Sequence, residues 1–194
     1  MKYKLPTGYV AKEMTRDDFV KYFEKHAPKV FTDNLDYDPD QINSKGAQEK
    51  FKILNKQFVS PTQYRIHLGV FYKNKFVGLS WGFQYSSTTF YMCNSAVLEK
   101  HRRKGIYTYL MNEVVQKASE QGFSHIFSRH IMTNNDILIS KLKMGFKITS
   151  FELSERFGNL VHLTYFPQKI RSYILDFRSG FKRPDKKMKK LFKL

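Results

Sequence analysis

Five consecutive positions, Lys100 to Lys104, carry four Lys or Arg side chains and one His, and the run ends at Gly105. Apolar residues then recur at helical spacing, so a helix is expected to begin at the glycine. The first amides of a helix have no intrahelical partner and lie at its positive end, where they bind anions. Glycine has no Cβ and lets a phosphate come close to the backbone. The pattern predicts a cradle for a pyrophosphate group.

The same basic run is also typical of three other features. Short clusters of Lys and Arg occur on ordinary solvated surfaces, in sorting signals and in nucleic-acid patches. Here the cluster lies between a predicted strand, Phe90 to about Leu98, and the predicted helix after Gly105. A strand that runs directly into a helix N-terminus favours the phosphate cradle over the other three interpretations.

Two stretches resemble the motifs of the GNAT superfamily of acyl-CoA-dependent N-acyltransferases. The stretch VLEKHRRKGIYTYL, from position 97 to 110, is similar to the family's acyl-CoA-binding signature, (Arg/Gln)-x-x-Gly-x-(Gly/Ala). Arg102 and Gly105 match it, and Tyr107 stands where Gly or Ala is commonest. The stretch NNDILISKLKMGFK, from position 134 to 147, resembles the family's downstream Asn-x-x-Ala-x-x-Leu-Tyr-x-Lys-x-Gly-Phe segment. Its matching residues are Asn134, Lys143, Gly145 and Phe146.

The resemblance implies transfer of an acetyl group from acetyl-CoA, as co-substrate, to a primary amine by direct attack. Backbone groups near the end of the predicted strand Phe90 to Leu98 would pair with the pantetheine arm. One amide there would polarise the thioester carbonyl. The amides at the helix start would hold the pyrophosphate, the basic side chains would reach the 3′-phosphate, and Asn134 would lie near the sulfur. The implied coenzyme-binding residues are Ala96, Val97, Leu98, Arg102, Arg103, Lys104, Gly105, Ile106, Tyr107 and Asn134.

The catalytic residues are not fixed by the resemblance. The family's frequent general acid, a Tyr, would fall at position 141, where this chain has Lys141, a catalytic candidate whose cation would stabilise the leaving thiolate. The third strand has no evident carboxylate base, and His67 on a neighbouring strand is the candidate in its place. His125 and His130 are expected to be strand residues with ordinary hydrogen bonds, and Asn134 is expected to cap a helix as well.

These residues need a scaffold of strands and helices. Helices are predicted over residues 15–26, 47–58, 106–118 and 136–144, and strands over 64–72, 75–86, 90–98, 125–131, 146–155 and 159–166. A two-residue turn at Lys73-Asn74 would place Val77, Leu79 and Trp81 on one apolar face with Ile66 and Leu68. The order predicts an α/β fold of the α+β mixed-sheet type, a GNAT-like twisted mixed sheet flanked by helices.

The chain has 194 residues, which is enough for one domain with a single core. We expect an acetyltransferase domain over residues 1–166 and an appended basic helical extension over 167–194, which has ten Lys or Arg and two Asp. The extension would dock on its own domain, join a homodimer, or bind an anionic surface such as RNA or membrane.

The net charge of +17 draws the protein to polyanions in general. Cys93 is the single cysteine, so no intrachain disulfide can form, and no metal-ligand spacing is present. The sequence has neither a signal peptide nor an apolar run long enough to span a membrane, which predicts a cytoplasmic protein.

Two further alternatives stay open at this point. The acceptor is expected to be an amine on a small molecule or peptide, and an acidic stretch from Asp33 to Asp40 would attract a cationic one or would be a solvated loop. The rival function is a catalytically weak GNAT-like binding module, whose basic surface contacts nucleic acid or acidic proteins.

Overall fold

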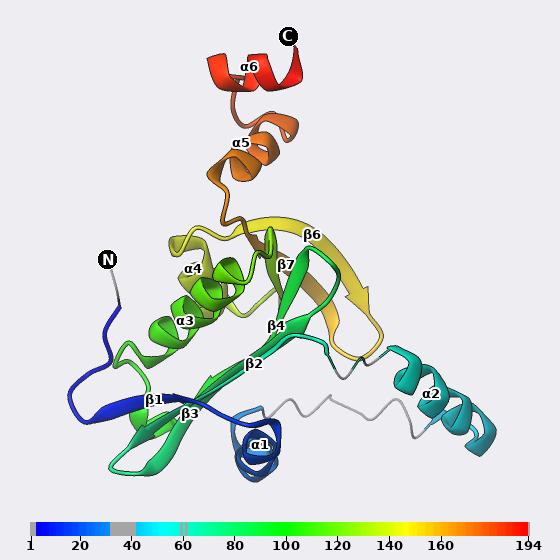
Figure 1. Cartoon of the computed structure of the whole chain (residues 1–194), viewed down its shortest axis with the longest axis vertical. Coiled ribbons are helices and arrows are strands. Elements are labelled where there is room, and N and C mark those ends of the chain that lie inside the picture. The colour runs from blue at the N-terminus through cyan, green and yellow to red at the C-terminus, as the bar shows by residue number, and fades with distance from the viewer. Residues whose placement is uncertain (1–2, 32–41, 59, 61, 194) are drawn as a thin grey trace.

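The computed structural model describes residues 3–31, 42–58, 60 and 62–193. One seven-stranded sheet, in the order β1-β2-β3-β4-β5-β7-β6, runs through the molecule with helices on both sides (Figure 1). The strands are β1 (Tyr9–Glu13), β2 (Arg65–Tyr72), β3 (Lys75–Gln84), β4 (Thr89–Val97), β5 (His125–Ile131), β6 (Lys147–Ser154) and β7 (Gly158–Tyr165). The helices are α1 (Arg16–Val30), α2 (Lys45–Phe58), α3 (Ile106–Glu120), α4 (Asn135–Lys143), α5 (Lys169–Arg178) and α6 (Lys186–Phe192), with a short 3-10 helix η2 (Glu99–His101).

The mixed sheet flanked by helices confirms the predicted fold class. All pairs of neighbouring strands are antiparallel except β4 and β5, which are parallel. The sequence interpretation missed β1, which pairs with β2 at the edge of the sheet. That strand has only five residues and is half exposed, so it carries no apolar run that would reveal it.

Helix α3 forms where the stripe of apolar residues predicted it. The residues of that stripe are all buried: Ile106, Leu110, Met111, Val114, Val115 and Ala118. They pack on one face of the sheet against β2, β4 and β5 in the main core. Helix α1 covers the opposite face and builds a second, smaller core around Phe19, Phe76 and Leu79. The sheet is therefore buried on both faces near its centre.

The predicted register of β2 and β3 was wrong beyond the turn. The two-residue turn forms at Lys73-Asn74, with both residues at positive φ, and Tyr72 pairs with Lys75. A bulge then shifts the register by one residue between Val70 and Phe71. As a result Leu79 packs under α1 in the second core, and Trp81 packs against it there instead of joining the apolar face of Ile66 and Leu68. A one-residue shift moves every later side chain to the other face.

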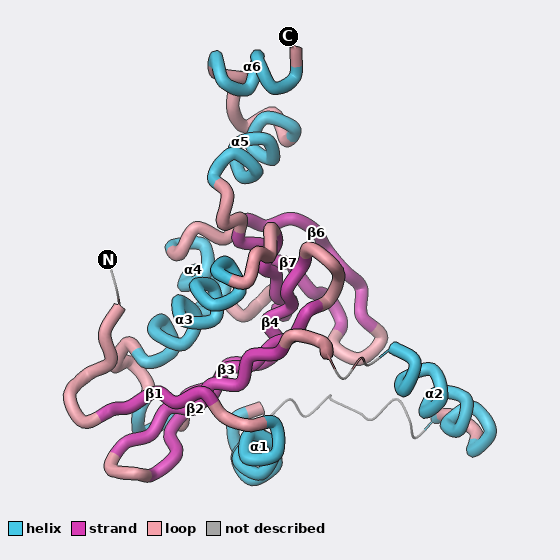
Figure 2. The backbone as a smooth tube through the Cα atoms, in the orientation of Figure 1, coloured by secondary structure: helices cyan, strands magenta, loops and turns pink. Residues whose placement is uncertain are grey.

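Three helices lie outside the main body. Helix α2 has no buried residue. Helices α5 and α6 follow one another beyond the end of the sheet, as Figure 2 shows. In α5 the buried Asp176 side chain accepts ion pairs from Lys147 on β6, at 3.1 Å, and from Lys182, at 3.4 Å. In the part of the chain that the structure describes, no helix is long and apolar enough to cross a membrane.

Candidate active site

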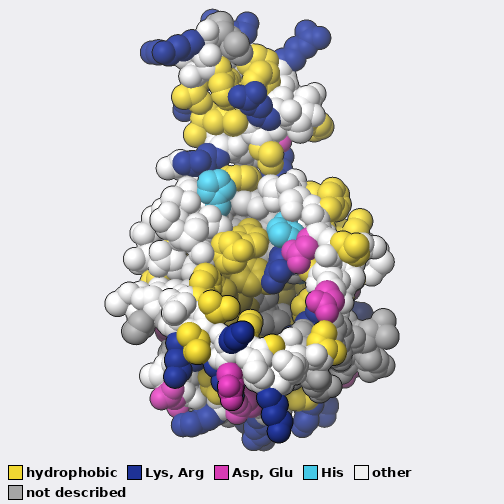
Figure 3. Space-filling model, turned by 90° about the vertical axis from the view of Figure 1, so that its right-hand side faces the viewer, with side chains coloured by type: hydrophobic (Ala, Val, Ile, Leu, Met, Phe, Trp, Pro, Cys, Tyr) yellow, Lys and Arg dark blue, Asp and Glu magenta, His cyan; other side chains and the backbone are white. Residues whose placement is uncertain are grey.

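The pair of parallel strands in the middle of the sheet separates to form a pocket. Strands β4 and β5 pair at only three positions, Thr89 to Tyr91 with His125 to Phe127. Beyond these residues each strand continues without pairing to the other. A pocket of about 330 Å³ opens between them, lined by Tyr91 to Ser95 from β4 and by Arg129 to Ile131 from β5. On the face in Figure 3 the molecule is hollowed, with hydrophobic side chains in the hollow and charged and histidine side chains at its edge.

A bulge in β4 lies on the wall of this pocket. Ser80 of β3 pairs with Ser95, but Gly82 pairs with Met92, so two β4 residues, Cys93 and Asn94, stand opposite Trp81 alone. The Trp81 indole N–H donates to Asn94 Oδ1 at 3.3 Å and holds the bulge in place. Backbone groups at a bulge leave the regular ladder. They are therefore available to a ligand in the pocket.

The start of α3 has the features of an anion cradle. Gly105 lies at φ 76°, and a Cβ added there would meet nothing within 4 Å. No side chain caps the helix, and its first intrahelical bond runs from the Tyr109 amide to the Gly105 carbonyl at 2.9 Å. The amides of residues 106–108 precede that bond and lack an intrahelical acceptor. Arg103, at φ 59°, and Lys104 are exposed beside them. This open, positive turn fits a pyrophosphate.

The basic loop is held by side-chain hydrogen bonds to the sheet. The Arg102 Nε donates to the Val97 carbonyl at 3.0 Å, which ties the loop back to the end of β4. The Lys104 ammonium donates to the Tyr9 hydroxyl at 3.3 Å, and that hydroxyl bonds His101 Nδ1 at 2.9 Å. The missed strand β1 thus supports the loop. The guanidinium of Arg102 holds the loop to the sheet, the exposed Lys104 is bonded to Tyr9, and Arg103 is exposed to solvent.

The predicted coenzyme-binding residues fall into two groups. Tyr107 and Asn134 line the pocket, and Asn134 Oδ1 also caps α4 by accepting from the Ile137 amide at 3.4 Å. Ala96 and Val97 are buried in the sheet, and the Leu98 amide donates to the Val77 carbonyl at 2.8 Å. The residues of β4 that line the pocket lie just before them, at positions 91–95. Burial raises the pKa of the Tyr107 hydroxyl, which stays protonated.

Lys141 reaches the pocket from α4, and His67 does not. Only 1% of the Lys141 surface is exposed, and its ammonium donates to the Ser128 hydroxyl at 2.6 Å and lies 4.8 Å from the centre of the Phe146 ring. Burial lowers the pKa of Lys141 to about 7. His67 instead lies in the second core, 4.8 Å from the Phe19 ring. Burial, and then nearby arginines, lower the pKa of His67.

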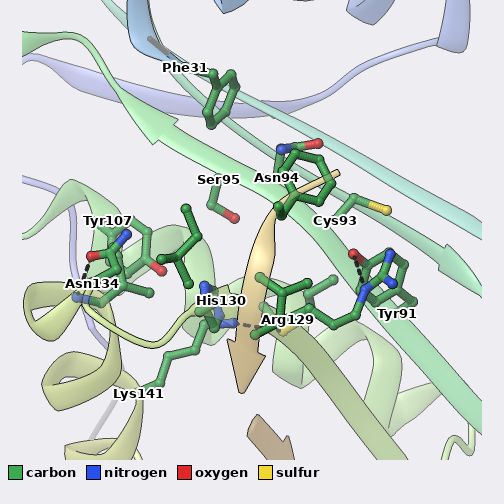
Figure 4. Close-up of a pocket in the computed structure, with 15 residues that line it drawn as sticks. Phe31, Tyr91, Cys93, Asn94, Ser95, Tyr107, Arg129, His130, Asn134 and Lys141 are labelled. Atoms are coloured by element: carbon green, nitrogen blue, oxygen red, sulfur yellow. Dashed lines mark hydrogen bonds between the residues drawn. The ribbon is translucent and has the colours of Figure 1, made fainter. Parts of the chain in front are cut away.

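Two polar residues of the site, Arg129 and Tyr91, were missed in the sequence, and His130 was expected only to be a strand residue with ordinary hydrogen bonds. Figure 4 shows Arg129, His130 and Tyr91 around the pocket. The Arg129 guanidinium donates to the Tyr91 hydroxyl at 3.2 Å and to the Glu152 carboxylate at 3.1 Å. His162 bonds the same carboxylate at 2.7 Å, which together with Arg129 lowers the pKa of Glu152. The sequence did carry one signal of a polar site. Ser128 and His130 follow the apolar Ile126 at every second position, so they lie on the same face of the strand.

Two further observations bear on the chemistry. Burial raises the pKa of the Cys93 thiol to about 12, so the thiol in the pocket is protonated and a poor nucleophile. Across the described residues no group of three or more His, Cys, Asp or Glu side chains could hold a metal ion. The Asp33 to Asp40 stretch lies outside the described residues, and the structure makes no statement about its role.

Comparison with known proteins gives a consistent picture. The sequence matches the acetyltransferase (GNAT) family over residues 16–146. No curated protein matches the chain by sequence. Many solved structures share its fold, and three of them illustrate the similarity. A GNAT family acetyltransferase from Streptococcus pneumoniae is 18% identical with a TM-score of 0.58, over 81% of this chain and 99% of that one.

The other two structures are similar to a comparable extent. A GNAT family acetyltransferase from Elizabethkingia anophelis, with acetyl-CoA bound, is 15% identical with a TM-score of 0.55, over 83% of this chain and 99% of that one. The ribosomal-protein-S18-alanine N-acetyltransferase from Escherichia coli is 10% identical with a TM-score of 0.59, over 81% and 93%. The family match runs from α1 to the end of α4, which is well over half of the sequence, and the chain therefore belongs to the GNAT family of acetyltransferases.

Proposed function

We propose that the protein transfers an acetyl group from acetyl-CoA to a primary amine of a small molecule or peptide. The observation that carries this proposal is the combination of two features at one place. Strands β4 and β5 separate after three paired positions, and Tyr107, in the first turn of the uncapped helix α3, lines the pocket that results. A long ligand with a phosphate end and a reactive end fits this arrangement. The relative from Elizabethkingia anophelis has acetyl-CoA bound.

The residues of this chain would hold the coenzyme along its length. The amides from Arg103 to Tyr107 would bind the pyrophosphate. The exposed side chain of Arg103 would meet the 3′-phosphate, and that of Lys104 would do so on leaving the Tyr9 hydroxyl. Backbone groups of β4, from its bulge at Cys93 and Asn94 to the end of the strand at Val97, would pair with the pantetheine arm as an added strand. One of those amides would donate to the thioester carbonyl as its oxygen gains negative charge. Asn134 would contact the same ligand near its sulfur.

Direct attack by the amine fits the state of the single thiol. Because Cys93 is protonated at neutral pH, an acetyl-cysteine intermediate is disfavoured. The nitrogen of the acceptor would form its bond to the acetyl carbon, and the carbon–sulfur bond would break with its electron pair on sulfur. The pocket contributes by holding the two reactants at the distance of attack. A proton is then needed at the sulfur and must leave the nitrogen.

We further propose that residues 1–166 form the catalytic domain and that residues 167–194 are an appended extension. The family match ends at residue 146, before the extension begins. The Asp176 carboxylate, which contacts Lys147 of β6 at 3.1 Å, would dock the extension on the domain. In that arrangement Lys182 pairs with Asp176, and the exposed lysines of α6 would remain available for an anionic partner, which leaves room for a binding function next to the enzyme activity.

The test is coenzyme binding by calorimetry and thermal melting. Saturating the native state at a hundred times the dissociation constant adds roughly 2.7 kcal/mol to the unfolding free energy, so acetyl-CoA is expected to raise the melting temperature measurably. Gly105→Glu is expected to reduce affinity at least a hundredfold, since its carboxylate would enter the anion cradle. Gly180→Glu is a matched control, because Gly180 has φ 75° and equally open surroundings but lies in the extension.

The outcomes separate the two functions. Binding of acetyl-CoA with release of thiol in the presence of pooled polyamines, amino sugars, aminoglycosides and short peptides supports the enzyme. A melting temperature that rises with a short RNA but not with acetyl-CoA supports the binding module instead. Equal loss of affinity in the Gly105→Glu and Gly180→Glu variants would show that backbone strain, and not the cradle, caused the effect.

A further inference from the structure

A chain of hydrogen bonds connects a buried lysine to the pocket. The Lys141 ammonium donates to Ser128 Oγ at 2.6 Å, and Ser128 Oγ lies 2.9 Å from His130 Nε2. Ser128 is fully buried on β5, and His130, two residues further on the same face, lines the pocket together with Lys141. Figure 4 shows the Lys141 side chain extending from α4 toward His130. The three side chains span two elements and form one polar line in an apolar region.

The hydrogen-bond donors in this line run in one direction. An ammonium group has donors only, so Ser128 Oγ accepts from Lys141. The serine hydroxyl is then free to donate its own proton to His130 Nε2. Burial, and then the charge of Lys141, lower the pKa of His130 to about 3, so the imidazole is neutral and carries its proton on Nδ1 when Nε2 accepts. Every member of the chain can thus pass a proton toward the pocket.

The charged and titratable neighbours do not offer a substitute. Tyr91 and Cys93 on β4 and Tyr107 on α3 all have a pKa raised by burial. These groups hold their protons at neutral pH and release them only in strong base. Arg129 on β5 is held by Tyr91 and Glu152. Burial alone lowers the pKa of Lys141, and no carboxylate of the described chain contributes to its shift. Lys141 is the group that changes charge near neutrality.

We propose that Lys141, Ser128 and His130 form a proton relay that delivers a proton from the interior of α4 to the thiolate leaving in the pocket. This inference rests on the proposed acetyl transfer and names the proton donor that transfer needs. His130 is the catalytic residue, since it meets the reacting atoms. Ser128 and Lys141 act through it, with Lys141 as the proton reservoir. Lys141, at the position where the family commonly has a tyrosine acid, therefore supplies the proton indirectly, through Ser128 and His130.

The proton steps balance without any further reactant. The carbon–sulfur bond breaks and leaves its electron pair on sulfur. The sulfur takes the proton from His130 Nδ1, His130 Nε2 takes the Ser128 hydroxyl proton, and Ser128 Oγ takes one proton from the Lys141 ammonium. Lys141 is left as a neutral amine. The acetylated nitrogen returns one proton to His130 Nδ1, and transfer back from His130 Nε2 through Ser128 Oγ restores both the Lys141 ammonium and the starting tautomer. The other proton of an ammonium acceptor goes to solvent.

A purely structural role would produce a different pattern. An apolar side chain of similar length would fill the space of Lys141 without the cost of burying an amine, because isolated buried charges are unfavourable. Ser128 and His130 could still bond one another in its absence. If Lys141 belongs to a relay, its replacement by an apolar side chain changes proton transfer. If Lys141 only fills space, the same replacement changes stability alone.

The test compares Lys141→Met, Ser128→Ala and His130→Gln with the surface control Lys169→Met in the full chain. Turnover is measured as thiol release from acetyl-CoA with the pooled amines, over a range of pH. Each relay variant is expected to lower kcat about 10²-fold at unchanged acetyl-CoA affinity, the usual range for a lost acid. The wild-type kcat profile is expected to fall on the alkaline side of pH 7, and Lys141→Met is expected to remove that limb.

A second readout requires no turnover. NMR of isotopically labelled Lys and His in the free protein is expected to show a lysine that titrates near neutral pH and is missing in Lys141→Met. The same variant is expected to raise the pKa of His130, since it removes a positive neighbour. An unchanged His130 titration, or a Lys141→Met enzyme with the wild-type pH profile, would overturn the relay while leaving acetyl transfer intact. A wild-type protein that neither binds acetyl-CoA nor releases thiol would overturn both proposals.

Discussion

Replacing Lys141 by Met is expected to remove a rise in stability between pH 7 and pH 9. The pKa of this amine falls from its ordinary 10.5 to about 7 on folding. Between these two values the unfolded chain binds one more proton than the folded chain, so the free energy of unfolding rises with pH. The stabilisation is fully present above the ordinary pKa and is lost as the pH falls through 7. The slope from this one group approaches about 1.4 kcal/mol per pH unit.

Two other buried groups limit the pH range in which the effect of Lys141 on stability can be measured. Folding raises the pKa of Cys93 from 9.0 to about 12, so its contribution has the opposite sign and lowers stability above pH 9. Folding lowers the pKa of His130 from 6.5 to about 3, so its contribution changes below pH 6.5. Between pH 7 and pH 9 the lysine is therefore the main source of the slope among these three.

Urea denaturation at half-unit steps of pH measures this effect directly. Lys141→Met is expected to flatten the curve and to be more stable than the wild type at pH 7, because an apolar side chain replaces a buried amine. The m-value is expected to stay constant, which shows that the unfolded state is unchanged. Lys169→Met serves as the exposed control and is expected to keep the wild-type slope. If Lys141→Met retained that slope as well, the amine would not be buried in the way the structure shows.

Two further changes test the packing. Phe90→Ala removes a fully buried ring from the main core and is expected to cost about 3–5 kcal/mol in urea denaturation, whereas Leu153→Ala, at a side chain that is 83% exposed, is expected to change stability by less than about 0.5 kcal/mol. Equal effects would contradict the core assignment. Asp176→Asn weakens the ion pairs to Lys147 and Lys182 and is expected to cost about 2 kcal/mol and to increase proteolysis after residue 167; an unchanged cleavage pattern would show that these ion pairs do not dock the extension.

The helices and strands whose apolar residues recur at a regular spacing were predictable from the sequence. Helix α3 forms where its apolar residues indicated, because it buries one continuous face on the sheet, and strand β5 forms over the predicted residues. The two-residue turn at Lys73-Asn74 was predictable as well. The bulge next to it was not, because a bulge depends on how neighbouring side chains pack and leaves no spaced signal. The one-residue shift at that bulge placed Leu79 and Trp81 on the opposite face of the sheet.

The candidate site was predictable only where it depends on local backbone. A glycine at the start of a helix indicates the candidate anion cradle, since the relevant amides follow it directly in the chain. The Lys141, Ser128 and His130 line joins residues of two elements, and its hydrogen bonds exist only after the sheet and α4 pack together. His67 looked accessible because α1 was not known to cover it. Long-range packing thus decides which polar residues meet.

The three-position contact between β4 and β5 divides the sheet into two sections of four and three strands. Helix α3 packs across the division and contacts strands of both sections, and Tyr107 in its first turn lines the pocket between them. A rigid-body tilt of one section against the other would widen or narrow the gap while stretching few interstrand bonds. A ligand bound at the helix terminus would then stiffen the whole sheet. Amide hydrogen exchange would slow first at the three positions where β4 and β5 pair.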